Sequence, residues 1–296
     1  MKRNVVSALI VVVNTDSAVF NTKADEGFAM RILDVHAHIY PPKIEAKAVN
    51  AIREFYDRPY MAHRGAADAL LESGRNAGVT DYLVFSTATV PHQVKSINDF
   101  ILGVTAEHPE FIGAGTIHVD YEDNLGELER IYNAGLRGIK FHPDFQKFNI
   151  DDERLFPSFE FLEDKGMFFI THSGDPRYPF SHPERVARVA KRFPKLKIIA
   201  AHFGGWMTWD IARRCLSQLP NVYIDTSSTY GFGGKEPMIE GFKAFDNTHI
   251  FFGCDYPMWD HKDELEVLYS LGLDDTTLKN VLYNNFARFY GLEEDK

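Results

Sequence analysis

Eight short runs rich in β-branched and aromatic residues recur along the chain from residue 31 onward, separated by polar segments of helical character. The runs are Ile32–His36, Val79–Ser86, Phe111–Val119, Leu136–His142, Met167–His172, Leu196–His202, Asn221–Thr226 and His249–Asp255. Alternation of strands and helices predicts parallel strands joined by right-handed crossovers. Because eight such units close into a ring, the predicted fold is an α/β (β/α)8 TIM barrel, with an open doubly wound sheet as the main alternative.

The segments between these runs carry helical signals. The clearest spans residues 182–193, where Pro183 lies in the first turn and Val186, Val189 and Phe193 recur at helical spacing. Similar segments are Glu127–Ala134, Thr208–Leu219, Met238–Phe245 and Leu278–Tyr290. No Gly-x-Gly-x-x-Gly follows the first predicted strand, which counts against a dinucleotide-binding version of the doubly wound sheet.

Composition limits the classes of function. The chain is 45% hydrophobic and 25% charged, so it has residues for a large core and is not globally disordered. Its 42 acidic against 32 basic residues argue against a broad nucleic-acid-binding surface. Two cysteines cannot form a disulfide framework, and no apolar run is long enough to cross a bilayer. We therefore expect a soluble, cytoplasmic protein that acts on a small molecule, without a nucleic-acid or membrane partner.

Residues 1–30 depart from the repeating pattern. A basic start and the apolar run Val5–Val13 have the character of a signal peptide, but Asn14–Val19 offers a poor cleavage site. Alternatively, Val5–Val13 pairs with a following short strand, or the functional protein begins at Met30. We predict an N-terminal appendage or small strand pair over residues 1–30 and a barrel domain over residues 31–296.

Several of the twelve histidines fall at predicted C-terminal strand ends, the barrel face where active sites are built. Because side chains alternate along a strand, His36 and His38 share one face of the first strand, and Val35 and Ala37 face the other way. The other strand-end donors are His172, His202 and Asp255. Imidazole and carboxylate donors at one rim suit zinc, and also manganese or iron(II). The remaining histidines considered lie in polar stretches and are predicted to be surface residues: His63, His92, His108, His182 and His261.

Five segments carry motifs in a characteristic order. They are Ile32–Pro41, Gly138–Pro143, Thr171–Gly174, Ala201–Gly205 and Phe252–Pro257. As a set they resemble the amidohydrolase superfamily, and within it the amidohydrolase family 2 branch that includes aminocarboxymuconate-semialdehyde decarboxylase. The resemblance extends from about residue 31 to the end of the chain, and it supports the interpretation of the earlier residues as an addition.

The resemblance implies four metal ligands from the first, fifth and eighth strands: His36, His38, His172 and Asp255. It also implies that His202 lies beside the metal, where it would orient or deprotonate the attacking group or stabilise developing negative charge. The implied cofactor is one divalent ion, most often zinc. Lys140 leaves the metal count open, because some related binuclear enzymes carry a carboxylated lysine there that bridges two ions. Related barrels commonly pair, so a homodimer is a further expectation.

This ligand set predicts an enzyme. A zinc-type ion lowers the pKa of bound water to about 7. Asp255 would then accept the proton of the water, and His202 would hydrogen-bond the substrate carbonyl. We therefore predict a metal-dependent hydrolase that cleaves an amide, ester or lactone in a small, carboxylated or cyclic substrate.

The alternative is a metal-dependent, non-oxidative decarboxylase of the same family. Such an enzyme needs a cation to hold a substrate carboxylate. Four arginines follow the first or fifth strand: Arg53, Arg58, Arg64 and Arg177. Aromatic residues that could wall a planar substrate at the same rim are Tyr40, Phe203, Trp206, Tyr256 and Trp259.

Overall fold

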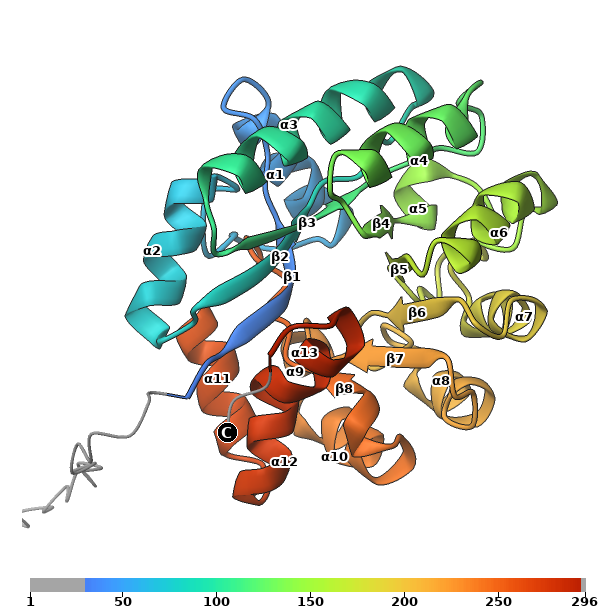
Figure 1. Cartoon of the computed structure of the whole chain (residues 1–296). Helices are drawn as coiled ribbons and strands as arrows, with labels where there is room; N and C mark the ends of the chain where they lie inside the picture. The colour runs from blue at the N-terminus through green and yellow to red at the C-terminus, as the bar shows by residue number, and fades with distance from the viewer. Residues whose placement is uncertain (1–29, 294–296) are drawn as a thin grey trace, which may run out of the picture.

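A computed structural model of the protein describes residues 30–293, which form eight parallel strands surrounded by helices (Figure 1). The strands are β1 (Leu33–His38), β2 (Asp81–Phe85), β3 (Phe111–Gly115), β4 (Gly138–Phe141), β5 (Phe168–Thr171), β6 (Lys197–Ala200), β7 (Val222–Asp225) and β8 (Ile250–Phe251). Strands adjacent in sequence pair in parallel, from β1 to β8. The predicted (β/α)8 barrel is confirmed. Apart from Met30, the appendage predicted over residues 1–30 lies outside the described residues.

The barrel closes where the chain that follows β8 meets β1. The amide of Asp255 donates to the carbonyl of His36 at 2.8 Å, and the amide of His38 donates to the carbonyl of Tyr256 at 2.8 Å. Ala37 and Tyr256 form a parallel bridge at the same place. The closure therefore brings the predicted donors of the first and eighth strands side by side.

The helices surround the strands, except that α13 covers one end of the barrel. They are α1 (Glu45–Phe55), α2 (Ala67–Ala77), α3 (Val94–Glu107), α4 (Asn124–Asn133), α5 (Pro143–Gln146), α6 (Phe156–Asp164), α7 (Pro183–Arg192), α8 (Trp209–Leu216), α9 (Thr229–Gly233), α10 (Lys235–Ala244), α11 (His261–Tyr269), α12 (Asp275–Lys279) and α13 (Asn285–Tyr290). The segments predicted from periodicity fall on α4, α7, α8, α10 and α12–α13. We did not identify α1, α2, α3, α6 or α11 from the sequence.

A break in register on β1 decides which of its side chains face the barrel interior. The pairing with β2 shifts between Asp34 and Ala37, which is the signature of a β-bulge. Val35 consequently packs in the interior apolar cluster, whereas Ala37 packs in the layer between strands and helices. The expectation that Val35 faces away from His36 and His38 is wrong, because the bulge interrupts the regular alternation.

An aromatic cluster fills the interior of the barrel at the N-terminal end of the strands. Helix α13 supplies Phe286 and Phe289, whose ring centroids lie 5.5 Å and 5.3 Å from that of Phe251. The Phe168 ring on β5 lies 5.1 Å from Phe289, and Figure 1 shows α13 crossing this end of the barrel. The interior at this end is therefore packed with apolar side chains, and the polar donors lie at the other end.

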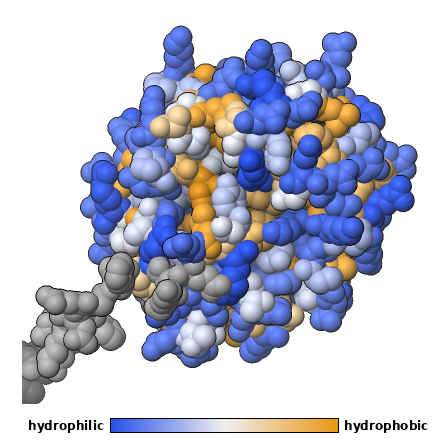
Figure 2. All heavy atoms as spheres, viewed as in Figure 1, coloured by the Kyte–Doolittle hydropathy of each residue, from blue (hydrophilic) through white to orange (hydrophobic). Residues whose placement is uncertain are grey.

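The face of the molecule in Figure 2 is covered mostly by hydrophilic residues, with hydrophobic residues in small patches between them. Within residues 30–293, no helix combines the length and apolar character needed to cross a lipid bilayer.

Candidate metal centre

Three of the predicted ligands form one compact donor group. The Nε2 atoms of His36 and His38 are 3.3 Å apart, and Asp255 Oδ1 lies 3.5 Å and 3.6 Å from them. Ligand atoms bound to one tetrahedral ion at about 2.1 Å stand about 3.4 Å apart. The separations in this group therefore fit a single divalent ion.

The remaining two predicted site residues adjoin this group. His202 lies with its ring centroid 5.0 Å from that of His36, and its Nε2 is 3.1 Å from His172 Nδ1. His172 is not part of the three-donor group of His36, His38 and Asp255 and reaches it through His202. The structure thus gathers all five predicted side chains at one rim, with His172 the most distant of the ligand set.

Two of these side chains leave their strands in an unusual backbone conformation. Asp255 and His202 have φ angles of 64° and 61°, in the left-handed region that non-glycine residues adopt rarely. The surrounding hydrogen bonds hold them there: Asp255 donates its amide to His36, and His202 donates its amide to Asp225 Oδ1 at 3.0 Å. In these turns both side chains lie beside the other donors.

Burial keeps the imidazoles of the site uncharged. Burial, with a further contribution from the Lys140 ammonium, lowers the pKa of His36 and His38 well below 6.5. Burial also lowers the pKa of His172 and His202 to about 3. Since a metal ion binds neutral imidazole, these side chains are ready to act as ligands without losing a proton.

Lys140 faces the same donors from β4. Its Nζ lies 3.0 Å from His36 Nε2 and 4.4 Å from the centre of the Phe85 ring. Burial lowers the pKa of this fully buried lysine to about 8. At this pKa the amine still holds its proton for most of the time at neutral pH, so it places a positive charge beside the three donors.

Two carboxyl groups of the site have a pKa raised by burial. The pKa of Asp255 rises to about 6, although the Ser228 hydroxyl donates to Asp255 Oδ2. The pKa of Asp144 rises to about 7, and its Oδ2 lies 3.7 Å from His172 Nε2. Both carboxyl groups can therefore carry a proton near neutral pH.

The four arginines considered as partners of a substrate carboxylate differ in their contacts. Three already pair with carboxylates: Arg53 with Glu54, Arg64 with Asp68 and Arg177 with Asp175. Arg58 has no ion pair within residues 30–293, and its Nε is buried there without a hydrogen-bond partner. Its guanidinium lies over the Trp259 ring, 4.2 Å from the centroid, and Trp259 Nε1 donates to the Ser228 hydroxyl at 2.8 Å. Within residues 30–293, Arg58 is therefore a cation without a carboxylate partner, connected to Asp255 through Trp259 and Ser228.

Comparison with known proteins identifies the family of the chain. Residues 33–292 match the amidohydrolase family. The chain belongs to the amidohydrolase family. This amidohydrolase is 33% identical over 241 residues to 2-amino-3-carboxymuconate-6-semialdehyde decarboxylase of Dictyostelium discoideum, across 68% of this chain and 67% of that protein. The resemblance drawn from the five motifs is confirmed, and with it the expectation of an enzyme.

Solved structures show the same fold at lower identity. An uncharacterised TIM-barrel protein from Bordetella bronchiseptica is 19% identical, with a TM-score of 0.73 over 88% of this chain and 98% of its own. A dihydroxybenzoic acid decarboxylase from a Polaromonas species, solved with manganese and the inhibitor 2-nitroresorcinol, is 15% identical, with a TM-score of 0.67 over 89% of this chain and 97% of its own.

Three polar residues that surround the candidate site were not predicted from the sequence. Asp225 ends β7 and contacts His36, and the strand-end rule applied to the other donors would have found it. His142 stacks on His172 with 4.2 Å between centroids and 7° between planes. The Tyr56 hydroxyl lies 2.9 Å from His142 Nε2. Tyr56 directly follows α1, and nothing in its local sequence marks it as a site residue.

The aromatic residues expected at the rim divide into two groups. Trp206 lies 6.2 Å from His172 between ring centroids and 5.2 Å from Tyr56, and Trp259 lies beside Ser228. Phe203 instead packs in the outer layer against Phe242. Trp206 therefore borders His172, and Trp259 is connected to Asp255 through Ser228.

His261 is not a surface residue in this amidohydrolase. It is fully buried, with Nδ1 2.7 Å from the Ser73 hydroxyl and Nε2 3.1 Å from Asp34 Oδ2. Asp34 Oδ1 accepts the backbone amides of His36 and Cys254 at 2.8 Å and 2.9 Å. The surface prediction is wrong because α11, which was not identified from the sequence, packs against β1.

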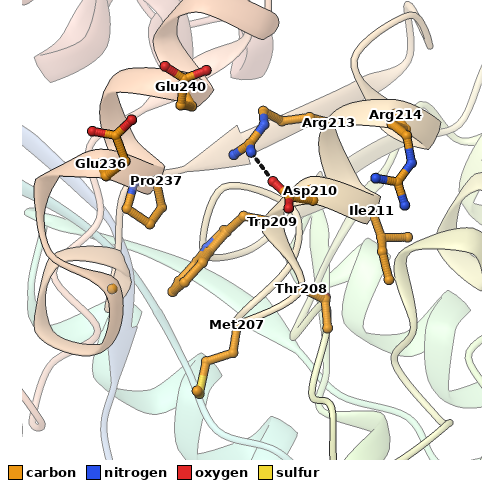
Figure 3. A pocket seen from close by; sticks show the side chains of 11 residues that line it. Met207, Thr208, Trp209, Asp210, Ile211, Arg213, Arg214, Glu236, Pro237 and Glu240 are labelled. Carbon is orange, nitrogen blue, oxygen red and sulfur yellow. Dashed lines mark hydrogen bonds and ion pairs between the residues drawn. The ribbon is translucent and has the colours of Figure 1, made fainter.

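A surface hollow lies between α8, α9 and α10, apart from the donors (Figure 3). Trp209 and Pro237 form apolar parts of its wall, and Arg213 pairs with Asp210 at its edge. Trp209 Nε1 donates to the carbonyl of His202 at 3.0 Å. The hollow thus backs onto the loop that carries His202 but contains no predicted site residue.

Proposed function

We propose that this amidohydrolase is a metal-dependent decarboxylase of a small carboxylic acid. The observation that carries the proposal is its 33% identity to 2-amino-3-carboxymuconate-6-semialdehyde decarboxylase. Arg58 adds support, because a cation that has no ion pair within residues 30–293 and is connected to Asp255 through Trp259 and Ser228 suits a substrate carboxylate. The hydrolase expected first from the sequence would use the same donors, but the comparisons favour the decarboxylase alternative.

The proposed cofactor is one divalent ion at the rim. His36, His38 and Asp255 would hold it, with His172 as the fourth proposed ligand. Zinc is the ion predicted from the sequence, and the manganese in the Polaromonas structure supports a second candidate. Nitrogen and oxygen donors accommodate either ion.

The residues of the site account for each requirement of decarboxylation. When bound, the divalent ion supplies Lewis-acid polarisation of substrate oxygens. Arg58 would bind a substrate carboxylate through charge-assisted hydrogen bonds, and Trp206 would contact a planar substrate. The bond to the departing carboxylate breaks as CO2 leaves, and its electron pair stays on the carbon. Asp255, whose pKa burial raises to about 6, would pass a proton from water to that carbon.

The proposal is tested with the full chain loaded with zinc or manganese. CO2 release from aromatic and muconate-type acids is measured in parallel with cleavage of lactones and amides. We expect CO2 from at least one acid. Cleavage of a lactone or amide without CO2 from any acid would instead support the hydrolase prediction. Elemental analysis is expected to give one equivalent of metal per chain, and two equivalents would instead favour a bridging role for Lys140.

A small-molecule substrate is expected of this enzyme family. A homodimer and a cytoplasmic location are further proposals, carried over from the sequence. Light scattering of the purified chain tests the dimer, and fractionation of cells that express it tests the location.

A further inference from the structure

Asp225 joins two predicted site residues that come from different strands. It ends β7 and is fully buried. Its Oδ2 lies 2.9 Å from His36 Nδ1, and its Oδ1 accepts the backbone amide of His202 at 3.0 Å. The amide and hydroxyl of Ser227 also donate to Oδ1. One carboxylate therefore contacts a side chain from β1 and the backbone of the turn after β6.

This contact determines which nitrogen of His36 carries the proton. An ionised carboxylate only accepts hydrogen bonds, so Nδ1 of His36 must be the donor. The Ser227 hydroxyl, 3.1 Å from Nδ1, already gives its proton to Asp225 and can only accept from His36. The lone pair of His36 is then on Nε2, the atom that faces His38, Asp255 and the Lys140 amine. A metal ion needs that lone pair.

The hydrogen bonds of Asp225 argue against a role as a metal ligand itself. One carboxylate oxygen of Asp225 does lie close to ring nitrogens of His36 and His202, in a group that could hold an ion. However, Oδ1 accepts from two backbone amides and a hydroxyl, and Oδ2 accepts from His36. Both oxygens are engaged by these hydrogen bonds on the Nδ1 side of His36, and not beside its Nε2, so Asp225 acts through the imidazole and not on the ion.

We propose that Asp225 is a positioning residue that holds His36 in the metal-binding tautomer and fixes the turn that carries His202. The inference rests on the proposed metal site. Carboxylate partners of metal-binding histidines typically contribute about 10- to 100-fold to metal affinity.

The test is the zinc affinity of Asp225→Asn in the full chain, measured by competition with a chromophoric chelator. The asparagine keeps the shape, but it has one acceptor oxygen for contacts that now use two. With that oxygen on the backbone amides, its NH2 group faces Nδ1 of His36 and moves the imidazole proton to Nε2. We expect a loss in zinc affinity of about 10- to 100-fold and an altered visible spectrum of the cobalt-substituted protein. The melting temperature of the metal-free protein should change by only a few degrees.

The matched control is Asp246→Asn, which changes a carboxylate that caps an exposed turn through the Thr248 amide. It should leave zinc affinity and the cobalt spectrum unchanged. Wild-type affinity and spectrum in Asp225→Asn would overturn the inference and leave the metal site standing. A wild-type chain that binds no divalent ion would overturn both. If Asp225→Asn does not fold, Ser227→Ala decides: affinity within threefold of wild type supports Asp225 as the positioning group, and a tenfold loss assigns that task to Ser227.

Discussion

The guanidinium of Arg58 lies face-on to the indole of Trp259, with 4.2 Å from its central carbon to the ring centroid. A cation over an aromatic face is held in place while its N–H groups stay free for a ligand. Trp259 donates to Ser228, and Ser228 donates to Asp255. The proposed carboxylate-binding cation and the proposed proton donor are therefore linked through two side chains.

Replacement of Arg58 by methionine should weaken binding of the acid substrate. A charge-assisted hydrogen bond contributes about 1.5–3 kcal/mol, so we expect KM for CO2 release to rise about 10- to 100-fold. Arg188→Met is the matched control, since Arg188 is exposed on α7 and pairs with Asp151, away from the donors. A KM for Arg58→Met equal to that of the control would show that the carboxylate binds elsewhere.

Asp255→Asn should remove turnover and preserve the fold. The asparagine can still accept from the Ser228 hydroxyl, but it cannot deliver a proton, and loss of a general acid lowers rates by about 100- to 10,000-fold. Asp263→Asn on the exposed face of α11 is the control. The measurements are kcat and the circular-dichroism spectrum. A folded variant that keeps wild-type kcat would exclude Asp255 as the proton donor.

Gly253→Ala should crowd the contact between Asp225 and His36. The added Cβ would lie 3.0 Å from Cβ of His36 and 3.2 Å from Cβ of Ser227. We expect weaker zinc binding and a loss of about 1–3 kcal/mol in the free energy of unfolding, the usual cost of overpacking. The control is Gly103→Ala in α3, where nothing lies within 4 Å of the new Cβ. It should stabilise the protein by up to about 1 kcal/mol. Urea unfolding of both variants and the wild type makes the comparison. A Gly253→Ala variant as stable as the wild type would show that the strands accommodate the methyl group without strain.

Glu264 should make the protein less stable as pH rises. Burial raises its pKa in the folded chain to about 8, from an ordinary value near 4.5. Between these values the folded chain binds more protons than the unfolded chain, so the contribution of Glu264 to the free energy of unfolding falls as pH rises from about 4.5 to 8. Glutamine stays neutral at every pH. The free energy of unfolding of Glu264→Gln should therefore increasingly exceed that of the wild type across that window, by up to about 4 kcal/mol at pH 8.

Glu266→Gln is the control for this effect, because Glu266 is exposed on the same helix. Its difference from wild type should stay below about 0.5 kcal/mol at every pH. Thermal and urea unfolding between pH 5 and pH 9 make the comparison. A Glu264→Gln difference that does not change with pH would rule out a shifted pKa as its cause.

Local periodicity identified some elements and missed others for physical reasons. The segment 182–193 has a strong apolar stripe and became α7 (Pro183–Arg192). Helix α1 has no buried residue, so it lacks the apolar stripe on which periodicity depends. Helix α11 buries His261 and Glu264, and a polar residue gives no sign from sequence that its helix face points inward. Tyr56 was missed for the same reason.

The sequence by itself determined the order of strands and helices, the family, and the five donors at strand ends. Strand–helix alternation and the order of the motifs can be recognised from residues that are neighbours in the sequence. The tertiary structure decided what depends on contacts between distant segments. It showed that the residues after β8 close the barrel on β1, that a bulge turns Val35 inward, and that Arg58 lacks a carboxylate partner within the described residues. It also brought Asp225 to His36, 189 residues away in the chain. Such contacts follow from how strands and loops pack in space, and no spacing in the sequence encodes them.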